Sequence, residues 1–456
     1  MLIRFVVSNF MSFKEETEFN MLPSKGNGSR QLTNHIKKTK SGVEVLKTAA
    51  IYGANAAGKS NLVKAIAFLK SIVVNDIELL VPLSKRFRLD KAFLEDKPST
   101  FRIEYEYQGI HFDYAVEIFK GKIKEEWLYL INSVKKNNEE LLFKRNNNEV
   151  EFGEYFQDKN DLLFAKKFFK KELKDNETVL NNCYLLFENN KILDKICEAF
   201  EKIHLVFPNS INVEFNESVF LGTKKLDFAN KILSNSKTGI EKIVMKKLKA
   251  DLFFGLDDIN IKNNLIDQLE STSQDKKDNK KQKAIVFIYR NKHYSFIKND
   301  NEYNVLMLCT KHENSDFTFD FHEESDGTNR LFELAPAFEE LLNEDDFVYI
   351  VDELERSMHP LLAKELLKTY SLNSKTNSQL IFTTHESHLL DDELLRRDEI
   401  WFTEKKSDGS TEFYPLSNFN PRGDKVLERG YLQGRFGGIP FLGDFSKLAE
   451  KILIDE

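Results

Sequence analysis

The eight residues GANAAGKS, from Gly53 to Ser60, constrain this chain more than any other stretch. They fit the spacing G-x-x-x-x-G-K-[S/T], in which a glycine-rich loop leads into the first turn of a helix. Such a loop is a concave anion site, because its successive backbone N–H groups and the positive end of the helix face the same point. The spacing therefore predicts a phosphate-binding loop.

The residues on either side of the loop predict the strand and the helix that such a site needs. The segment 43–52 is apolar and predicts a buried strand, and 61–74 has the apolar spacing of a helix. This context argues against the alternative, a chance match on an ordinary loop. Gly53 and Gly58 allow a tight turn, and Lys59 can reach the β- and γ-phosphates. The expected nucleotide-binding residues are Gly53, Asn55, Gly58, Lys59, Ser60 and Asn61.

Two carboxylates follow a continuous apolar run in the last third of the chain. The run FVYIV at 347–351 predicts a buried strand, and Asp352 and Glu353 come directly after it. Parallel sheets bind their ligands at the carboxyl ends of the strands. We therefore expect Asp352, together with the Ser60 hydroxyl, to hold Mg²⁺, and Glu353 to polarise an attacking water as a general base. The alternative interpretation is an exposed acidic turn.

Two further segments extend this candidate site. The run QLIFT at 379–383 predicts another buried strand, and the following Thr-Thr-His places His385 at the same sheet edge, near the γ-phosphate. Upstream, Ser325 and Gly327 open a predicted helix that starts near Thr328, which would form a second anion site at a helix N-terminus. A simple helix N-cap is the alternative there, because serine favours that position in any helix.

The order of the predicted elements indicates an α/β fold. Strands at 347–351, 379–383 and 399–403, with a helix at 360–372, predict a mainly parallel sheet. The alternating N-terminus, and the segment 100–118 with a turn at Gln108-Gly109, predict an additional antiparallel sheet. Helical spacing in the middle predicts a largely helical insertion. We expect three parts: an N-terminal lobe at 1–134, the insertion at 135–315, and a C-terminal lobe at 316–456.

Composition narrows the class of protein. The chain has 66 basic and 73 acidic residues, a net charge of −7, so no global basic surface indicates nucleic acid. The charged run at 274–283 predicts a solvated loop, or less readily a basic contact. Three cysteines with no C-x-x-C pair argue against a disulfide scaffold. No apolar run approaches the roughly 20 residues of a membrane span, so we expect a cytoplasmic protein with no membrane contact.

Together these motifs resemble the ATP-binding heads of the ABC class in the SMC/RecF/OLD branch. The stretches LIRFVVSNFMSF, GANAAGKSNL, DELERSMHP and YLQGRFGGIPFL look like those of bacterial abortive-infection ATPases, an AbiLi-like group that includes the AriA-type subunits of PARIS phage-defence systems. The resemblance covers about residues 1–120 and 316–445. The middle of the chain does not contribute to it.

The resemblance implies a function as an ATP-hydrolysing switch that depends on Mg²⁺. In that family two heads sandwich ATP, so the phosphate loop of one copy would face Ser325 and Gly327 of another, and 355–358 would be the loop after the acid pair. It implies a homo-oligomer, an effector partner such as a nuclease or another toxin encoded nearby, and a phage-derived trigger. Control of that effector through head dimerisation is the leading hypothesis.

The chain also departs from the family pattern. We do not assign a Q-loop glutamine, because Gln108 lies in a predicted hairpin turn, which is not where one is expected. The insertion has no sustained heptads, which excludes a long coiled coil. A C-terminal nuclease module is not recognisable, so a partner would carry any nuclease chemistry. A RecF-like ATPase that acts on DNA in repair or maintenance is the alternative function, and a slowly hydrolysing scaffold is a third.

Overall fold

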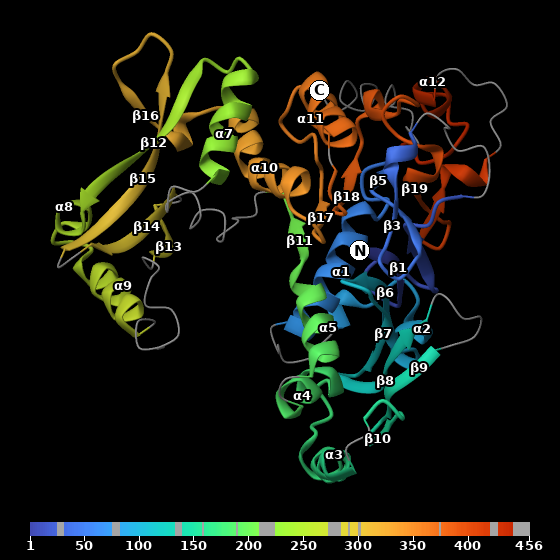
Figure 1. The fold of residues 1–456 in the computed structure, drawn as a ribbon. Coiled ribbons are helices and arrows are strands. Elements are labelled where there is room, and N and C mark those ends of the chain that lie inside the picture. Colours follow the sequence, from blue (N-terminus) through green and yellow to red (C-terminus); the bar gives the residue numbers. More distant parts are fainter. Residues whose placement is uncertain are drawn as a thin grey trace, which may run out of the picture. The chain divides into compact units, whose positions relative to one another are not determined.

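The computed structural model describes most of the chain, which folds into two compact units (Figure 1). The first contains residues 1–207, 344–354 and 367–456, and the second contains residues 208–343 and 355–366. The described residues are 1–24, 32–74, 83–132, 139–156, 159–187, 190–208, 224–271, 284–290, 292–299, 302–373, 375–419 and 427–440.

A six-stranded, mostly parallel sheet is the centre of the first unit. Its order is β11-β17-β18-β5-β19-β20, and only β20 runs antiparallel. Its strands are β5 (Thr48–Gly53), β11 (Ile203–Val206), β17 (Val348–Val351), β18 (Gln379–Thr384), β19 (Ile400–Lys405) and β20 (Thr411–Pro415). Neighbouring β17, β18 and β5 end at the same edge, because all three are parallel. The predicted α/β fold class is therefore confirmed.

A seven-stranded antiparallel sheet is the second layer of this unit, in the order β10-β9-β8-β7-β6-β1-β2. Its strands are β1 (Leu2–Ser8), β2 (Thr17–Asn20), β6 (Ser99–Tyr107), β7 (Ile110–Phe119), β8 (Lys122–Ile131), β9 (Glu139–Asn146) and β10 (Glu149–Phe152). The predicted N-terminal hairpin and the hairpin that turns at Gln108-Gly109 are both present.

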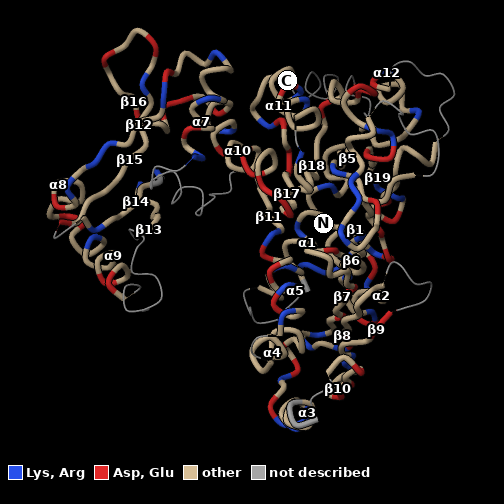
Figure 2. The backbone as a smooth tube through the Cα atoms, viewed as in Figure 1, with Lys and Arg blue, Asp and Glu red and all other residues tan. Residues whose placement is uncertain are grey.

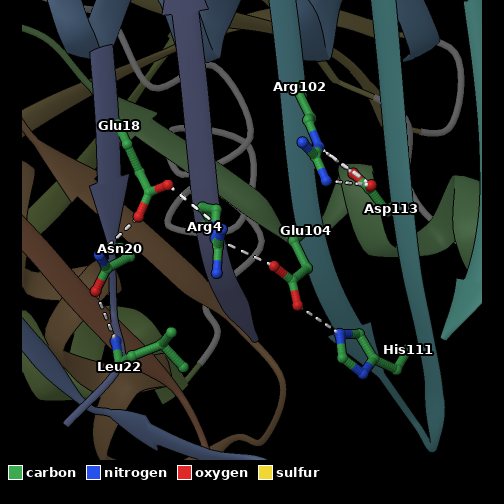
Figure 3. A network of polar contacts seen from close by, with 8 residues as sticks. All are labelled: Arg4, Glu18, Asn20, Leu22, Arg102, Glu104, His111 and Asp113. Atoms are coloured by element: carbon green, nitrogen blue, oxygen red, sulfur yellow. Dashed lines mark hydrogen bonds and ion pairs between the residues drawn. The ribbon is translucent and has the colours of Figure 1, made fainter. Parts of the chain in front are cut away.

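Charged pairs cross one face of this antiparallel sheet (Figure 3). Arg4 on β1 pairs with Glu104 on β6 at 3.3 Å, and Glu104 in turn contacts the His111 ring at 3.0 Å. Arg102 and Asp113 form a further cross-strand pair at 2.7 Å. Opposite charges on neighbouring strands stabilise the register of the sheet.

Helix α1 (Lys59–Val74) joins the two layers. Its apolar residues Leu62, Ile66 and Leu69 belong to one core that also includes Phe101 of the antiparallel sheet and Ile381 of the parallel sheet. Their spacing of three and four residues puts them on one side of the helix. The other helices of this unit include α2 (Lys91–Asp96), α3 (Lys159–Glu172), α4 (Val179–Leu186), α5 (Lys191–Glu201) and α12 (Leu427–Leu432), while α11 (Pro360–Asn373) spans the division between units.

The second unit is built on an antiparallel sheet in the order β12-β15-β14-β13, and β16 pairs with β15. Its strands are β12 (Ile240–Lys249), β13 (Ala284–Tyr289), β14 (Lys292–Asn299), β15 (Glu302–His312) and β16 (Thr318–Asp320). Its helices are α7 (Lys224–Asn235), α8 (Ala250–Phe254), α9 (Ile259–Ser271) and α10 (Asp326–Asn343). Phe254, Leu265, Phe296 and Val305 form its core.

The expectation of a largely helical insertion at 135–315 is wrong. The chain there forms helices only in part, and β9 to β15 are strands of three different sheets. The physical reason is visible in β12, an edge strand whose exposed lysines interrupt the apolar alternation that would indicate a strand. The division into units also differs from the predicted boundaries at 134/135 and 315/316, because β9 and β10 complete the sheet of the first unit.

Charged residues of both signs are distributed over the described parts of the chain (Figure 2). Lys and Arg are interspersed with Asp and Glu along both units (Figure 2). Among the described helices, none is both long and apolar enough to traverse a lipid bilayer. The charged run at 274–283 lies outside the described residues.

Candidate functional site

The loop 53–58 connects the carboxyl end of β5 to the first residue of α1, as the spacing predicted. Gly53 lies against β19: a Cβ atom there would be 2.2 Å from the Thr403 hydroxyl oxygen. Gly58 has a φ of +118°, which L side chains rarely adopt. Both glycines are therefore required by the geometry of the loop, the first by close packing and the second by backbone conformation. Asn55 lies between them and is exposed.

Lys59 is folded back over the loop that precedes it. Its side chain is only 7% exposed, and its ammonium donates to the carbonyl oxygens of Gly53 at 2.6 Å and Ala54 at 3.1 Å. Phosphate oxygens are stronger, charge-assisted acceptors than backbone carbonyls. The ammonium therefore lies where it could exchange these bonds for bonds to a bound phosphate.

A chain of hydrogen bonds links the start of α1 to the acid that follows β17. The Ser60 hydroxyl donates to Asp352 Oδ1 at 3.0 Å, and the Thr383 hydroxyl donates to the same oxygen at 2.6 Å. Asp352 is 3% exposed. A hydroxyl and a carboxylate are hard oxygen ligands, and such a pair suits Mg²⁺, which takes few protein ligands and completes its shell with phosphate and water. These residues fit the predicted metal.

Backbone hydrogen bonds to Thr383 fix the position of Glu353 next to Asp352. The Glu353 N–H donates to the Thr383 hydroxyl at 2.8 Å, and the following Leu354 N–H donates to the Thr383 carbonyl at 3.1 Å. Glu353 has a φ of +51°, in the left-handed region, where a non-glycine residue costs about 1–2 kcal/mol. Its side chain is half-buried. Strained residues of this kind cluster at functional sites, where the surrounding contacts enforce them.

His385 comes directly after β18, at the edge where β5 and β17 also end, and its side chain is exposed. The structure therefore brings together the loop, Lys59, Ser60, Asp352 and Glu353, with His385 at the same edge. Sequence reasoning missed Thr383, which connects the acid to the general-base candidate. The sequence signal that could have identified it is the pair of threonines in TTH at the end of the predicted strand. Because side chains alternate along a strand, one of the two has to face the neighbouring Asp352, and in the structure it is Thr383.

Ser325 and Gly327 lie in the second unit, at the start of α10. The Ser325 hydroxyl oxygen accepts the Thr328 N–H at 3.2 Å, so Ser325 is the N-cap that the simpler interpretation predicted. A Cβ on Gly327 would be 2.7 Å from the Ser357 carbonyl, so the loop after the acid pair packs directly on this turn. A polar cavity of about 270 Å³ adjoins it. It is lined by Asp326, Asn329, Arg330, Glu333, Arg356 and Ser357.

A family profile described as "AAA domain, putative AbiEii toxin, Type IV TA system" matches residues 49–391, which is more than half of the chain. The chain belongs to this AAA family. This is a family of P-loop ATPases, which implies ATP binding, and the loop at 53–60 lies within the matched range. The matched range includes Asp352, Glu353 and His385, and it leaves out residues 1–48 and 392–456.

Solved structures similar to this chain include three SMC head domains, each 13% identical. One is an SmcHead bound to the C-winged helix domain of ScpA (TM-score 0.42; 94% of this chain and 99% of that chain covered). Another is an SMC head from Thermotoga maritima (0.40; 91% and 98%). The third is a Pyrococcus furiosus Smc head with an extended coiled coil, bound to the C-terminal domain of ScpA (0.43; 95% and 98%). No curated protein matches the chain.

Proposed function

We propose that this chain is an ATP-hydrolysing switch of a bacterial abortive-infection or toxin–antitoxin system. The hydrogen-bonded chain from Ser60 through Asp352 to Thr383 carries the proposal. These hydrogen bonds connect the phosphate loop to Asp352 and, through Thr383, to the backbone of Glu353. Loss of the γ-phosphate would therefore alter the contacts of Ser60, Asp352 and Glu353 together. The family description, which names a toxin of a type IV toxin–antitoxin system, supports the biological setting.

In the proposed reaction the residues divide the work by position. Backbone N–H groups of the loop and the Lys59 ammonium bind the phosphates of ATP. Ser60 and Asp352 would hold Mg²⁺, which neutralises charge that develops on the β- and γ-phosphates. Glu353 accepts a hydrogen bond from the attacking water and orients it toward the γ-phosphate. His385, at the same sheet edge, would contact the γ-phosphate and respond to its loss.

The switch would require two copies of the chain. Ser325 and Gly327 of one copy would close on the nucleotide held by the loop of another, through the N-terminal amides of α10. ATP favours the closed pair only to the extent that it contacts both copies in that state, and hydrolysis removes the γ-phosphate contacts. Opening and closing would then control an effector protein such as a nuclease or another toxin, as in AriA-type systems, in response to a phage-derived trigger.

The test is the variant Glu353→Gln, which keeps the size of the side chain and removes the base. We expect ATP to bind within about threefold of wild-type affinity and phosphate release to fall by about 10²- to 10⁴-fold, the usual contribution of a general base. Lys59→Ala is the matched control, and it should lose ATP binding itself. Titration with ATP and a phosphate-release assay on both variants provide the measurement.

Unchanged turnover in Glu353→Gln would exclude this carboxylate as the base. Full ATP binding by Lys59→Ala would instead remove the phosphate-loop assignment. The two variants therefore separate an error in the chemistry from an error in the site.

A further inference from the structure

Two segments outside the family match, one near each end of the chain, lie against the phosphate loop. Ser12 belongs to the tight turn after β1, and Thr411 is the first residue of β20. The Thr411 N–H donates to the Ser12 carbonyl at 2.8 Å, which fixes the two segments to each other. Both residues lie outside the range 49–391. Neither is among the loop residues that bind phosphate in the proposed reaction.

Three hydrogen bonds join these residues to the loop and to α1. The Asn61 side-chain amide lies 2.7 Å from the Ser12 hydroxyl, the hydroxyls of Ser12 and Thr411 are 2.7 Å apart, and the Thr411 hydroxyl donates to the Ala57 carbonyl at 2.8 Å. Each hydroxyl has one proton to donate. The assignment that makes all three bonds therefore runs from Asn61 to Ser12, from Ser12 to Thr411, and from Thr411 to the Ala57 carbonyl.

The last of these bonds sets the orientation of one peptide group in the loop. In a trans peptide the carbonyl and the following N–H point in opposite directions. Because the Ala57 carbonyl points toward Thr411, the Gly58 N–H points away from Thr411, to the side on which we place the bound phosphate. The inner side of a phosphate loop is where successive N–H groups meet the anion.

Gly58 also fits closely against Thr411. A Cβ atom on Gly58 would be 2.3 Å from the Thr411 hydroxyl oxygen and 3.0 Å from the Ser12 hydroxyl oxygen. Thr411 is 5% exposed, so its hydroxyl bonds within the protein rather than with bulk water. The turn that carries Ser12 is anchored by Asn9, which is fully buried and whose side chain bonds the Lys97 carbonyl at 2.7 Å. The turn behind the loop is therefore attached to the segment that carries Lys97.

We propose that Thr411 is a positioning residue of the nucleotide site, which acts through its hydroxyl to direct the Gly58 N–H toward the phosphates. The inference rests on the proposed function, because it assumes that the loop binds a nucleotide. It adds that the C-terminal strand β20 and the N-terminal turn hold the loop in its binding shape. If the contact served only to attach β20 to the core, its loss would affect stability and leave nucleotide affinity unchanged.

The experiment compares four variants of this 456-residue chain, the fourth being Ser12→Ala. Thr411→Val removes the hydroxyl and keeps the shape, Thr411→Ser keeps the hydroxyl, and Ser410→Ala is the matched control. Ser410 is equally buried and directly precedes β20, but its hydroxyl bonds Asp408 at 2.6 Å instead of the loop. We would measure the dissociation constants of Mg-ADP and Mg-ATP, the values of kcat and KM, and the melting temperature of each variant.

We expect Thr411→Val to weaken nucleotide binding about tenfold, the effect of one misdirected hydrogen bond to a charged group. KM should rise with it while kcat changes less than about twofold, because the lost contact acts equally on bound substrate and transition state. Thr411→Ser should bind within about threefold of wild type, and Ser410→Ala should be indistinguishable from it. Ser12→Ala, which breaks the same chain from the other side, should weaken binding in the same direction.

Wild-type affinity in Thr411→Val would overturn the inference, and so would an equal loss of affinity in Ser410→Ala. Lost affinity that tracks a lowered melting temperature in all variants would assign Thr411 a structural role only, which also overturns it. Failure of the wild-type chain to bind either nucleotide would reject the proposed function, and the inference with it.

Discussion

At the scale of single residues, Thr383 is a strand residue that hydrogen-bonds both candidate acidic residues without being a candidate ligand or base itself. Its hydroxyl donates to Asp352 at 2.6 Å and accepts the Glu353 N–H at 2.8 Å. One side chain therefore orients the metal-ligand candidate and stabilises the left-handed backbone of the general-base candidate. This arrangement depends on β17 and β18 being neighbours, with Val351 opposite Phe382 in the register.

Gly58 provides the first prediction. Gly58→Ala should weaken nucleotide binding by more than about tenfold, because the new methyl group would collide with Thr411 and φ of +118° disfavours any side chain. Gly42→Ala is the control: Gly42 has a φ of +93°, but its nearest neighbour to a Cβ is 4.0 Å away. That variant should lose some stability and keep its affinity. Calorimetric titration with Mg-ADP measures the affinity of both variants. Normal binding by Gly58→Ala would contradict the geometry described for the loop.

At the scale of elements, the start of α4 is held by a carboxylate from a neighbouring strand. Glu126 on β8 is fully buried, and it accepts the N–H groups of Val179 at 2.7 Å and Leu180 at 3.0 Å, and the Tyr114 hydroxyl at 3.1 Å. The first N–H groups of a helix have no acceptor within the helix, and the Glu126 carboxyl group supplies acceptors for two of them. Burial nevertheless raises the pKa of Glu126 from 4.5 to about 7.

The raised pKa predicts a specific dependence of stability on pH. Between pH 4.5 and about 7 the folded chain holds a proton on Glu126 that the unfolded chain has lost. Stability from this group is therefore complete below pH 4.5 and is lost as the pH rises to about 7, by at most about 3 kcal/mol. Glu126→Gln cannot ionise, so the free energy of unfolding of wild type relative to this variant should fall across that window. Urea unfolding at a series of pH values measures the difference, and a constant difference would contradict the pKa shift.

The elements also show which local patterns were informative. The parallel strands β5, β17, β18 and β19 are short apolar runs, and their positions follow from the sequence, because a strand buried on both faces has to be apolar throughout. The antiparallel strands of the second unit were missed. In β13 the residues AIVFIY are mostly β-branched and aromatic, which is a strand signal. The edge strand β12 of the same sheet carries exposed lysines, which obscure the strand pattern there.

At the scale of the whole molecule, the proposed switch depends on a second copy of the chain. In a Glu353→Gln background, ATP should convert the monomer to a dimer, and Ser325→Arg should abolish that change while each copy still binds ATP. The reason is steric: the larger side chain would occupy the turn at the start of α10, which is where the partner's nucleotide is expected. Mass measurements in solution, with and without ATP, provide the test.

Two control variants make the dimer prediction specific. Ser325→Ala removes the same helix cap, which costs about 1 kcal/mol, without adding bulk, and should still dimerise. Ser234→Arg makes the same substitution at an exposed position on α7 of the same unit. An ATP-dependent dimer that survives Ser325→Arg would remove Ser325 from the interface.

The sequence by itself determined the glycine-rich loop between β5 and α1, the acid pair after β17, the α/β class and the two antiparallel hairpins, because each follows from a local residue pattern. The tertiary structure decided the contacts that join distant segments. Ser12 and Thr411 are separated by almost the whole chain, yet they meet behind Gly58. Their contact depends on which strands pair and in what register, and β-sheet pairing is a non-local interaction that no single stretch encodes.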